Sequence, residues 1–378
     1  MLVELPGPLN AWSVTRYSVI QALTGDPRVS RDPRRHWPGL ADVPEGWPLA
    51  PHVLRQNLGT AYGEEHRRSR RRIAPSFSPR RIEQMRPQVQ ATTDRLVEAL
   101  AALPPGATAD VRQALALPLT MTVICDLFGV PHQMREKLGT AIDAVLDQSV
   151  DPERAMAIYA EVHNRLTELL QYKKEYPAAD LTSDLLLPSE PGDEPMPDPV
   201  LLDTLFLMIG AGYETGVNLI TSAVQALLIH PENLTRIREG SISWHDVVEE
   251  TLRVEGPIMH LPMRYAVEDI DLGEGVVIGK GDPIIIGFAA AGRDPELHPD
   301  RPEQFDPTRT SKEHLAFGHG PHFCLGAHLA RLEAEVALTT LFNHLPDLAL
   351  AHPREDPARV PSFIVTGPVA LEIVPRPA

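Results

Sequence analysis

Apolar residues recur at helical spacing along most of the chain, and this pattern predicts a mainly α-helical protein with small β-sheets. The ranges with helical periodicity are 15–23, 62–77, 80–103, 110–128, 133–146, 152–175, 199–229, 244–254 and 327–341. Short aliphatic runs predict strands at 2–14, 276–278, 283–287 and 362–366. Gly279-Lys280-Gly281 is expected to join the strands at 276–278 and 283–287 as a hairpin. Thr15 is expected to cap the first helix.

The longest helical range, about 199–229, would extend roughly 45 Å at the usual rise per residue. Its middle reads Gly210-Ala211-Gly212-Tyr213-Glu214-Thr215-Gly216. Each glycine inside a helix costs about 0.5–1 kcal/mol relative to alanine, so the segment indicates a kink or a close approach. The Thr215 hydroxyl can bond back to the carbonyl of Ala211, or water or a ligand can replace that bond. Helix packing through small residues is the alternative reading.

A cysteine lies in a glycine-rich turn, Phe317-Gly318-His319-Gly320-Pro321-His322-Phe323-Cys324-Leu325-Gly326, directly before a helix. Free backbone N–H groups and the positive end of the helix dipole favour thiolate over thiol at such a place. The glycines let N–H groups approach the sulfur and tune it as a metal ligand. His322 adds a hydrogen-bond donor two residues away. A buried free cysteine in a flexible turn is the alternative reading.

Composition excludes several classes of protein. A net charge of −16 disfavours nucleic acid as a partner. Two cysteines, Cys125 and Cys324, argue against a disulfide scaffold and for a reducing cytoplasm. We find no run of about 18 apolar residues and therefore expect no membrane span. Five of the 35 basic residues fall within Arg67–Arg72, which indicates either an acidic partner or a solvated helix face.

Four motifs together resemble the cytochrome P-450 superfamily of haem-thiolate monooxygenases, in its soluble, actinobacterial-like form. They are Phe-Gly-x-Gly-x-His-x-Cys-x-Gly at 317–326, Gly-x-Glu-Thr at 212–215, His66-x-x-x-Arg70 and Glu250-x-x-Arg253. The resemblance covers nearly the whole chain. It implies one domain over 1–378, a triangular prism with a buried haem b (iron protoporphyrin IX). The 317–326 loop would bind the iron, and the helix at about 199–229 would bind dioxygen.

The resemblance also assigns roles to individual residues. Cys324 would be the metal ligand, and Thr215 and Glu214 would be catalytic, handling dioxygen and protons. Propionate ligands would be His66, Arg70, Arg264 and His322, and the haem would also contact Phe317, Gly326 and Ala211. Leu207, Ala211, His260 and Ile364 would line the substrate pocket, although a backbone bond for His260 is as good an explanation. Glu250 and Arg253 would brace the fold, with Gln304 or a residue elsewhere as third partner.

The function implied is insertion of one atom of O2 into a lipophilic substrate of macrolide, polyketide or steroid type, in secondary metabolism. The sequence has no nucleotide-binding fingerprint and no iron–sulfur cysteine run, so electrons must come from outside. A ferredoxin with its NAD(P)H-dependent reductase is the expected donor, at the basic proximal face. A cytoplasmic monomer is expected. The alternatives are a haem-thiolate gas or redox sensor and a peroxide-driven peroxygenase, and the intact Glu214-Thr215 pair disfavours both.

Overall fold

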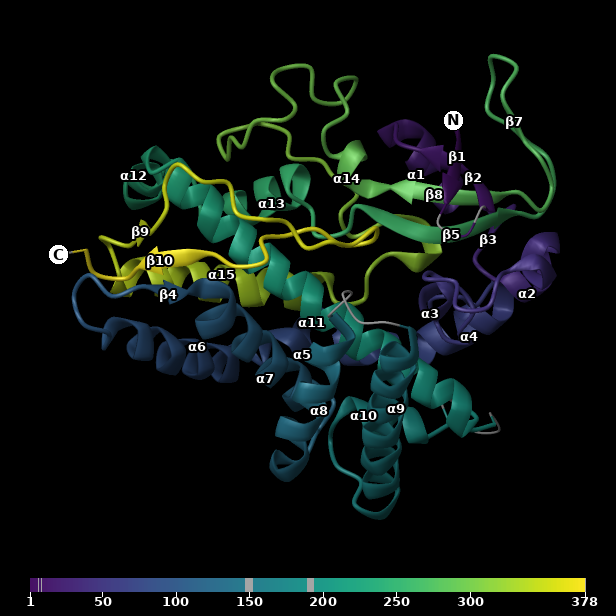
Figure 1. The fold of residues 1–378 in the computed structure, drawn as a ribbon, viewed down its shortest axis with the longest axis horizontal. Coiled ribbons are helices and arrows are strands. Elements are labelled where there is room, and N and C mark those ends of the chain that lie inside the picture. The colour runs from purple at the N-terminus through teal and green to yellow at the C-terminus, as the bar shows by residue number, and fades with distance from the viewer. Residues whose placement is uncertain (6, 8, 147–151, 189–193, 378) are drawn as a thin grey trace.

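A computed structural model describes residues 1–5, 7, 9–146, 152–188 and 194–377 (Figure 1). The α-helices are α1 (Tyr17–Gly25), α2 (Pro33–His36), α3 (Ala50–Val53), α4 (Gly63–Ile73), α5 (Pro79–Glu83), α6 (Arg86–Ala101), α7 (Leu117–Leu127), α8 (His132–Leu146), α9 (Pro152–Glu175), α10 (Leu181–Leu186), α11 (Asp198–Ile229), α12 (Glu232–Arg238), α13 (Trp244–Val254), α14 (Phe288–Ala291) and α15 (Ala327–His344). Short 3₁₀ turns are η1 (Pro38–Asp42), η2 (Ala74–Phe77) and η4 (Gly320–His322), and η3 (Arg112–Ala116) is a π-helical turn.

The strands form three small sheets. They are β1 (Leu2–Leu5), β2 (Leu9–Val14), β3 (Val29–Ser30), β4 (Ala109–Asp110), β5 (His260–Ala266), β6 (Ile270–Asp271), β7 (Val277–Ile278), β8 (Pro283–Gly287), β9 (Ala349–Leu350) and β10 (Glu372–Val374). The largest sheet has the order β1-β2-β8-β5-β3. A second has the order β4-β10-β9, and β6 pairs with β7 alone. The mainly helical class with small sheets is confirmed.

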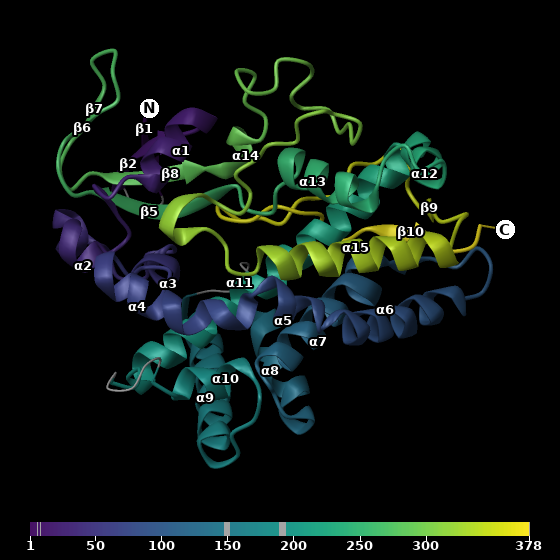
Figure 2. The same ribbon diagram turned by 180° about the vertical axis from the view of Figure 1, so that it is seen from behind.

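Helix α11 runs through the centre of the molecule, between the helical layer and the five-stranded sheet (Figures 1 and 2). Helices α7, α9, α13 and α15 pack against it. Within the described residues, α11 is the one helix long and apolar enough to span a membrane. Its residues from Gly216 to Gln225 are all buried inside the protein, which is what the central helix of a helical core requires.

Three local predictions were wrong. Thr15 does not cap α1; the backbone N–H of Tyr17 instead donates to Asp294 Oδ2 at 2.7 Å. The predicted hairpin does not form: β7 pairs with β6, whereas β8 pairs with β5 and β2. Residues 362–366 form no strand; the Ser362 hydroxyl accepts from the N–H groups of Ile364 and Val365 and holds a turn.

The two tryptophans of the N-terminal irregular region belong to the core. Trp37 and Trp47 are buried, with ring centroids 5.8 Å apart. Trp37 also stacks on Tyr265 of β5 at 5.5 Å. This cluster fixes the segment around α2 and η1 against the five-stranded sheet, and it therefore positions the residues just before α2.

Candidate functional site

The cysteine loop has the geometry that its glycines predicted. Gly318 and Gly320 have φ values of 73° and 72°, a region that other residues rarely adopt. A Cβ on Gly320 would lie 2.3 Å from the carbonyl oxygen of Thr24, so only glycine lets the loop pack on α1. The N–H of Cys324 donates to Phe317 O at 2.8 Å, and α15 begins three residues later at Ala327. The loop is therefore a fixed turn at a helix N-terminus.

The side chain of Cys324 is exposed to solvent, unlike that of Cys125, and its sulfur has polar neighbours. Desolvation by the protein atoms around the sulfur raises the pKa of the Cys324 thiol; the N–H of Gly326 and the charges of Arg70 and Arg331 oppose this rise. The sequence argument is thus correct that a backbone N–H group lowers the pKa of Cys324. This effect is smaller than the rise caused by desolvation. A metal cation bound to the sulfur would displace the proton outright. Burial also raises the pKa of Cys125, to about 11, without comparable opposition, as expected for a core cysteine.

Side chains from four separate segments meet beside this loop and form what we call the cationic cluster, namely Arg31, His66, Arg70, Arg264 and His322. The rings of His66 (α4) and His322 (η4) lie 4.0 Å apart. Burial lowers the pKa of His66 to about 4 and that of His322 well below its usual value, and the neighbouring arginines lower both further. Both imidazoles are therefore neutral at pH 7, and the arginines carry the positive charge.

The cationic cluster lacks anions. Arg31 Nε, His66 Nε2 and Arg264 Nη1 are buried and have no hydrogen-bond partner among the described residues. Leaving a buried donor unpaired costs about 1–3 kcal/mol, and a buried charge costs more. A bound ligand that pairs with these groups would offset this cost. Two adjacent carboxylates, such as haem propionates, fit the two orphaned guanidinium donors and His66 Nε2, which donates in one tautomer of the neutral ring. Cys324 would offer a sulfur to iron at the same place.

The glycine-rich part of α11 makes close approaches on one side and leaves open space on another. A Cβ on Gly212 would lie 2.5 Å from Ile124 Cδ1, and one on Gly216 would lie 3.0 Å from Thr120 Cγ2; both neighbours belong to α7. A Cβ on Gly210 would meet no atom within 4 Å. The close approach that the glycines predicted is therefore confirmed for Gly212 and Gly216, while α11 stays helical throughout.

The hydroxyl of Thr215 donates to the carbonyl oxygen of Ala211 at 2.5 Å, as the sequence suggested. Burial raises the pKa of the adjacent Glu214, and the charge of Arg112 opposes that rise. Arg112 Nη1 donates to Asn218 Oδ1 at 2.6 Å, one helical turn after Glu214. Glu214 is therefore a half-buried acid with a cation nearby, an environment that suits a group exchanging protons.

Helix α15 connects the cysteine loop with the glycine-rich part of α11. It follows the cysteine loop and packs on α11 (Figures 1 and 2). Glu333 Oε2 of α15 lies 3.6 Å from the position of a Cβ on Gly216, the residue after Thr215. Burial raises the pKa of Glu333 well above its usual value and so favours its neutral form near Gly216.

The predicted brace exists, and its third partner is an arginine. Arg253 Nε and Nη2 donate to the two oxygens of Glu250 at 2.8 Å and 2.7 Å, with both side chains inaccessible to solvent. Arg309 Nε donates to Glu250 Oε1 at 3.1 Å. Gln304 contributes its backbone carbonyl, which accepts from Arg253 Nη2 at 2.9 Å and from Arg309 Nη2 at 3.2 Å. A second cation, Arg309, therefore reaches Glu250 from five residues beyond Gln304.

Three of the residues predicted for a substrate pocket have neighbours that the structure identifies. His260 Nδ1 lies 3.1 Å from Phe363 O, and its ring stacks on Phe363 at 4.9 Å. The backbone of Ile364 accepts from Met259 and His260, so these segments are adjacent. Leu207 instead lies against Gly59, before α4. His260 thus has the backbone partner that was the alternative reading.

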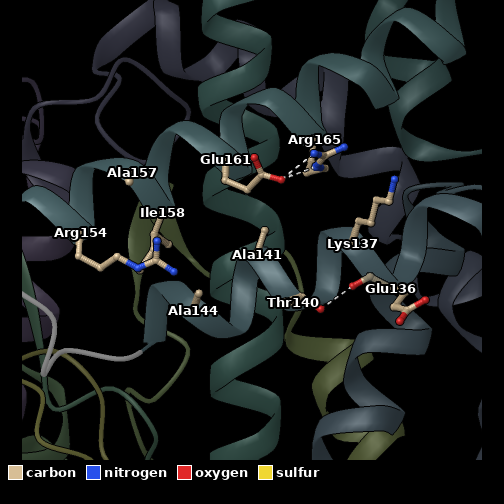
Figure 3. A pocket seen from close by; sticks show the side chains of 10 residues that line it. All are labelled: Glu136, Lys137, Thr140, Ala141, Ala144, Arg154, Ala157, Ile158, Glu161 and Arg165. Atoms are coloured by element: carbon tan, nitrogen blue, oxygen red, sulfur yellow. Dashed lines mark hydrogen bonds and ion pairs between the residues drawn. The ribbon is translucent and has the colours of Figure 1, made fainter.

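Two hollows accompany helices α8 and α9. A groove of about 650 Å³ lies between them and is rimmed by charged side chains, including the paired Glu161 and Arg165 (Figure 3). None of the predicted site residues lines it, so it is separate from the site. An apolar hollow of about 30 Å³ lies on their inner side, bounded by Phe206, Ile209 and Gly210 of α11. It opens the space beside Gly210 toward α8 and α9.

Comparison with known proteins supplies the family. The profile of the cytochrome P450 family matches residues 244–361. The chain is 38% identical to 2-hydroxy-5-methyl-1-naphthoate 7-hydroxylase of Streptomyces carzinostaticus, over 98% of this chain and 90% of that protein. The chain belongs to the cytochrome P450 family. It is a P450 monooxygenase, an oxidoreductase, and membership of the family implies a haem-thiolate cofactor.

Solved P450 structures agree with the fold. CYP154A1 from Streptomyces coelicolor A3(2) superposes with a TM-score of 0.93 at 46% identity, covering 99% of this chain and 93% of that one. A testosterone-bound CYP154C4 from Streptomyces sp. ATCC 11861 superposes with a TM-score of 0.94 at 37% identity, covering 99% and 92%. The P450 fold expected from the motifs is confirmed.

The sequence analysis did not identify residues whose role depends on contacts between distant segments and not on a motif. Arg31 of the cationic cluster stands among Arg28, Arg34 and Arg35, and no spacing distinguishes it from them. Arg112, the cation near Glu214, and Arg309, the third partner of the brace, likewise carry no local signal. Glu333 could have been found, because a lone acid on the apolar side of the helix after the cysteine is unusual.

Proposed function

We propose that this P450 inserts one oxygen atom from O2 into a lipophilic ring compound, a steroid-, polyketide- or macrolide-like molecule, in secondary metabolism. We take residues 1–378 to be one domain that binds haem b. The observation that carries this proposal is the pairing of Cys324 with an anion-deficient cationic cluster, beside an α11 segment that holds Thr215 and Glu214. Bound haem supplies the activation of O2 and the transfer of oxygen.

The protein's own residues bind the cofactor and manage its charge. Cys324 provides the thiolate, and Gly326 N–H donates to its sulfur. His66, Arg70, Arg264 and His322 hold the propionates. Phe317 packs beside the loop, with Arg331 centred 4.5 Å above its ring. Ala211 and Gly326 would contact the bound cofactor.

Thr215 and Glu214 deliver protons on the α11 side. The Thr215 hydroxyl gives its hydrogen to Ala211 O, so its oxygen lone pairs are free to accept a hydrogen bond. The raised pKa of Glu214 brings this acid closer to neutrality, where it can give up and regain a proton. Thr215 positions the proton donor, and Glu214 exchanges protons with water.

The nature of the substrate is supported by the relatives and by the apolar lining. One relative is a naphthoate hydroxylase and one is bound to testosterone, and both compounds are flat fused-ring molecules. Leu207, Ala211, His260 and Ile364 are proposed to contact the substrate, which would lie near the apolar hollow beside Gly210.

Electrons are proposed to come from a ferredoxin and its NAD(P)H-dependent reductase, docking at the basic face that carries Arg67–Arg72. The net charge of −16 and two cysteines fit a cytoplasmic monomer that binds neither nucleic acid nor membrane.

The test is to reconstitute the purified haem protein with a ferredoxin and reductase and to screen ring compounds through the haem absorption band. Compounds that shift the band should then acquire one ¹⁸O atom from ¹⁸O2 in an NADPH-dependent reaction. Product formation from peroxide alone would favour a peroxygenase. Ligand-induced spectral changes without any oxygen consumption would favour a sensor.

A further inference from the structure

Arg31 is a buried guanidinium without a carboxylate partner. It lies between β3 and α2 and is 8% exposed. Its Nη2 donates to the carbonyl oxygen of Pro262 at 3.1 Å, and its Nε has no partner among the described residues. The neighbouring acid, Asp32, is already engaged by Arg34 through bonds of 2.9 Å and 3.0 Å. The charge of Arg31 is therefore not neutralised by the protein parts that the structure describes.

The fold places this charge beside Arg264. Strand β3 pairs antiparallel with β5, Ser30 opposite Tyr265, so the register brings Arg31 opposite Arg264. The rings of His66 and His322 lie 4.0 Å apart beside these two arginines. Burial lowers the pKa values of Arg264, His66 and His322, and the positive charge of Arg31 lowers them further. Arg264 is 3% exposed, and its Nη1 is also unpartnered. Two like charges are thus buried side by side.

Such an arrangement is costly unless an anion joins it. Each buried ion loses several kcal/mol of hydration, and two like charges repel each other in a medium of low dielectric constant. No protein carboxylate within the described chain pairs with either guanidinium. A ligand anion that reaches both guanidiniums and His66 Nε2 would supply the missing partner.

We propose that Arg31 binds a propionate of the haem and shares it with Arg264, an assignment that rests on haem being the cofactor. Its bond to Pro262 O, two residues before Arg264, ties Arg31 to the strand that carries its partner. The two guanidiniums are thereby held in place before the cofactor arrives. None of the motifs that identify the family includes this residue.

The experiment compares Arg31→Met and Arg31→Lys with Arg35→Met, which removes an exposed arginine from the same segment. Haem transfer from each holoprotein to excess apomyoglobin gives the release rate, and resonance Raman spectra give the propionate bending mode. Release from Arg31→Met should be about tenfold to a hundredfold faster than from wild type, because a charge-assisted hydrogen bond is lost. Arg35→Met should match wild type, and Arg31→Lys should lie between. The propionate mode should shift in both Arg31 variants.

Several results would overturn the proposal. One is release from Arg31→Met at the rate of Arg35→Met. Another is faster release with an unchanged propionate mode, which would mean that Arg31 only stabilises the sheet through Pro262. If Arg31→Met purifies without haem, Arg31→Lys decides: retention of haem with a shifted mode supports the proposal, and loss of haem overturns it. The absorption band of the reduced carbon monoxide complex distinguishes failure of this proposal from failure of the proposed function. If the wild-type protein lacked that band, the assignment of haem as the cofactor would itself fail.

Discussion

The hydroxyl of Thr215 is bonded to the carbonyl oxygen of Ala211, one turn earlier in the same helix, at 2.5 Å. This bond duplicates a helical backbone contact, so its loss should change the stability little. Thr215→Ala should therefore retain haem and bind substrate, but it should convert NADPH and oxygen to peroxide rather than product. A general acid–base contribution of this kind is worth about 10²–10⁴-fold, and product per NADPH is the measurement.

Thr221 provides the matched control for that experiment. It makes the same bond to the residue four positions earlier, Val217 O, at 2.8 Å, but lies further along α11 in the buried core. Thr221→Ala should keep the ratio of product to NADPH. Equal ratios in both variants would remove Thr215 from the proton route.

Cys324→Ser should abolish the reduced carbon monoxide absorption band typical of a thiolate-bound haem. Cys324 stands in the rigid loop at the start of α15, whereas Cys125 is buried in α7 among apolar residues. Cys125→Ser should keep the band. The reverse outcome would show that the metal ligand has been misassigned.

Arg264→Ala should weaken haem retention more than Arg70→Ala does. Arg264 is buried with an unpartnered Nη1, whereas Arg70 is only half-buried. A charge-assisted hydrogen bond contributes about 1.5–3 kcal/mol, and less where water competes. Haem release to apomyoglobin is the measurement, with the exposed Arg68→Ala as control. Wild-type release in both variants would reject the assignment of the propionate ligands.

Arg68 is the residue of the basic run whose charge should guide a ferredoxin. Arg67 and Arg71 bond to Glu64, and Arg72 donates to the carbonyl of Glu194, whereas Arg68 is exposed and has no ion pair within the described chain. Arg68→Ala should slow reduction by an acidic ferredoxin a few-fold at low ionic strength, and the difference should fade with salt.

The control for Arg68 is Arg67→Ala, which removes a charge that Glu64 already offsets. Its effect on the reduction rate should be smaller. If both variants are reduced at the wild-type rate in low salt, the run of arginines is a solvated helix face.

Glu333 should make the protein less stable as the pH rises. Burial raises its pKa well above the ordinary 4.5, so the folded protein binds a proton that the unfolded chain has lost. Stability is greatest below pH 4.5 for this group and falls, by up to about 1.4 kcal/mol per pH unit, until the folded pKa is reached. Glu333→Gln should flatten this slope in chemical denaturation measured from pH 5 to 8. Glu355→Gln, which removes an exposed carboxylate, should not. An unchanged slope in Glu333→Gln would mean that Glu333 is ionised in the folded protein.

The sequence predicted those features whose causes are local. The cysteine loop, the central helix and the Glu250–Arg253 pair each depend on residues within a few positions of one another, and periodicity or spacing reveals them. The bounds of α9 and α13 agree with the predicted ranges for the same reason.

Features decided by distant residues could not be predicted. Asp294 takes the capping role expected of Thr15 from 277 positions away from Tyr17. Arg309 reaches Glu250 across 59 positions. Arg31 becomes part of the cationic cluster only because β3 pairs with β5. A run of strand-forming residues likewise cannot specify its partner, which is why β8 joined a different sheet from β7.

The cationic cluster and the cysteine loop are far apart in the order in which the chain is made. Arg31, His66 and Arg70 leave the ribosome early, Arg264 follows, and Cys324 comes close to the C-terminal end. A nascent chain therefore carries unneutralised charges long before it gains the proposed iron ligand. The proposed capture of haem through Cys324 cannot be completed until residue 324 has been made, so a cell short of haem would accumulate polypeptide without cofactor. The yield of active enzyme should then depend on haem supply more than on the rate of translation.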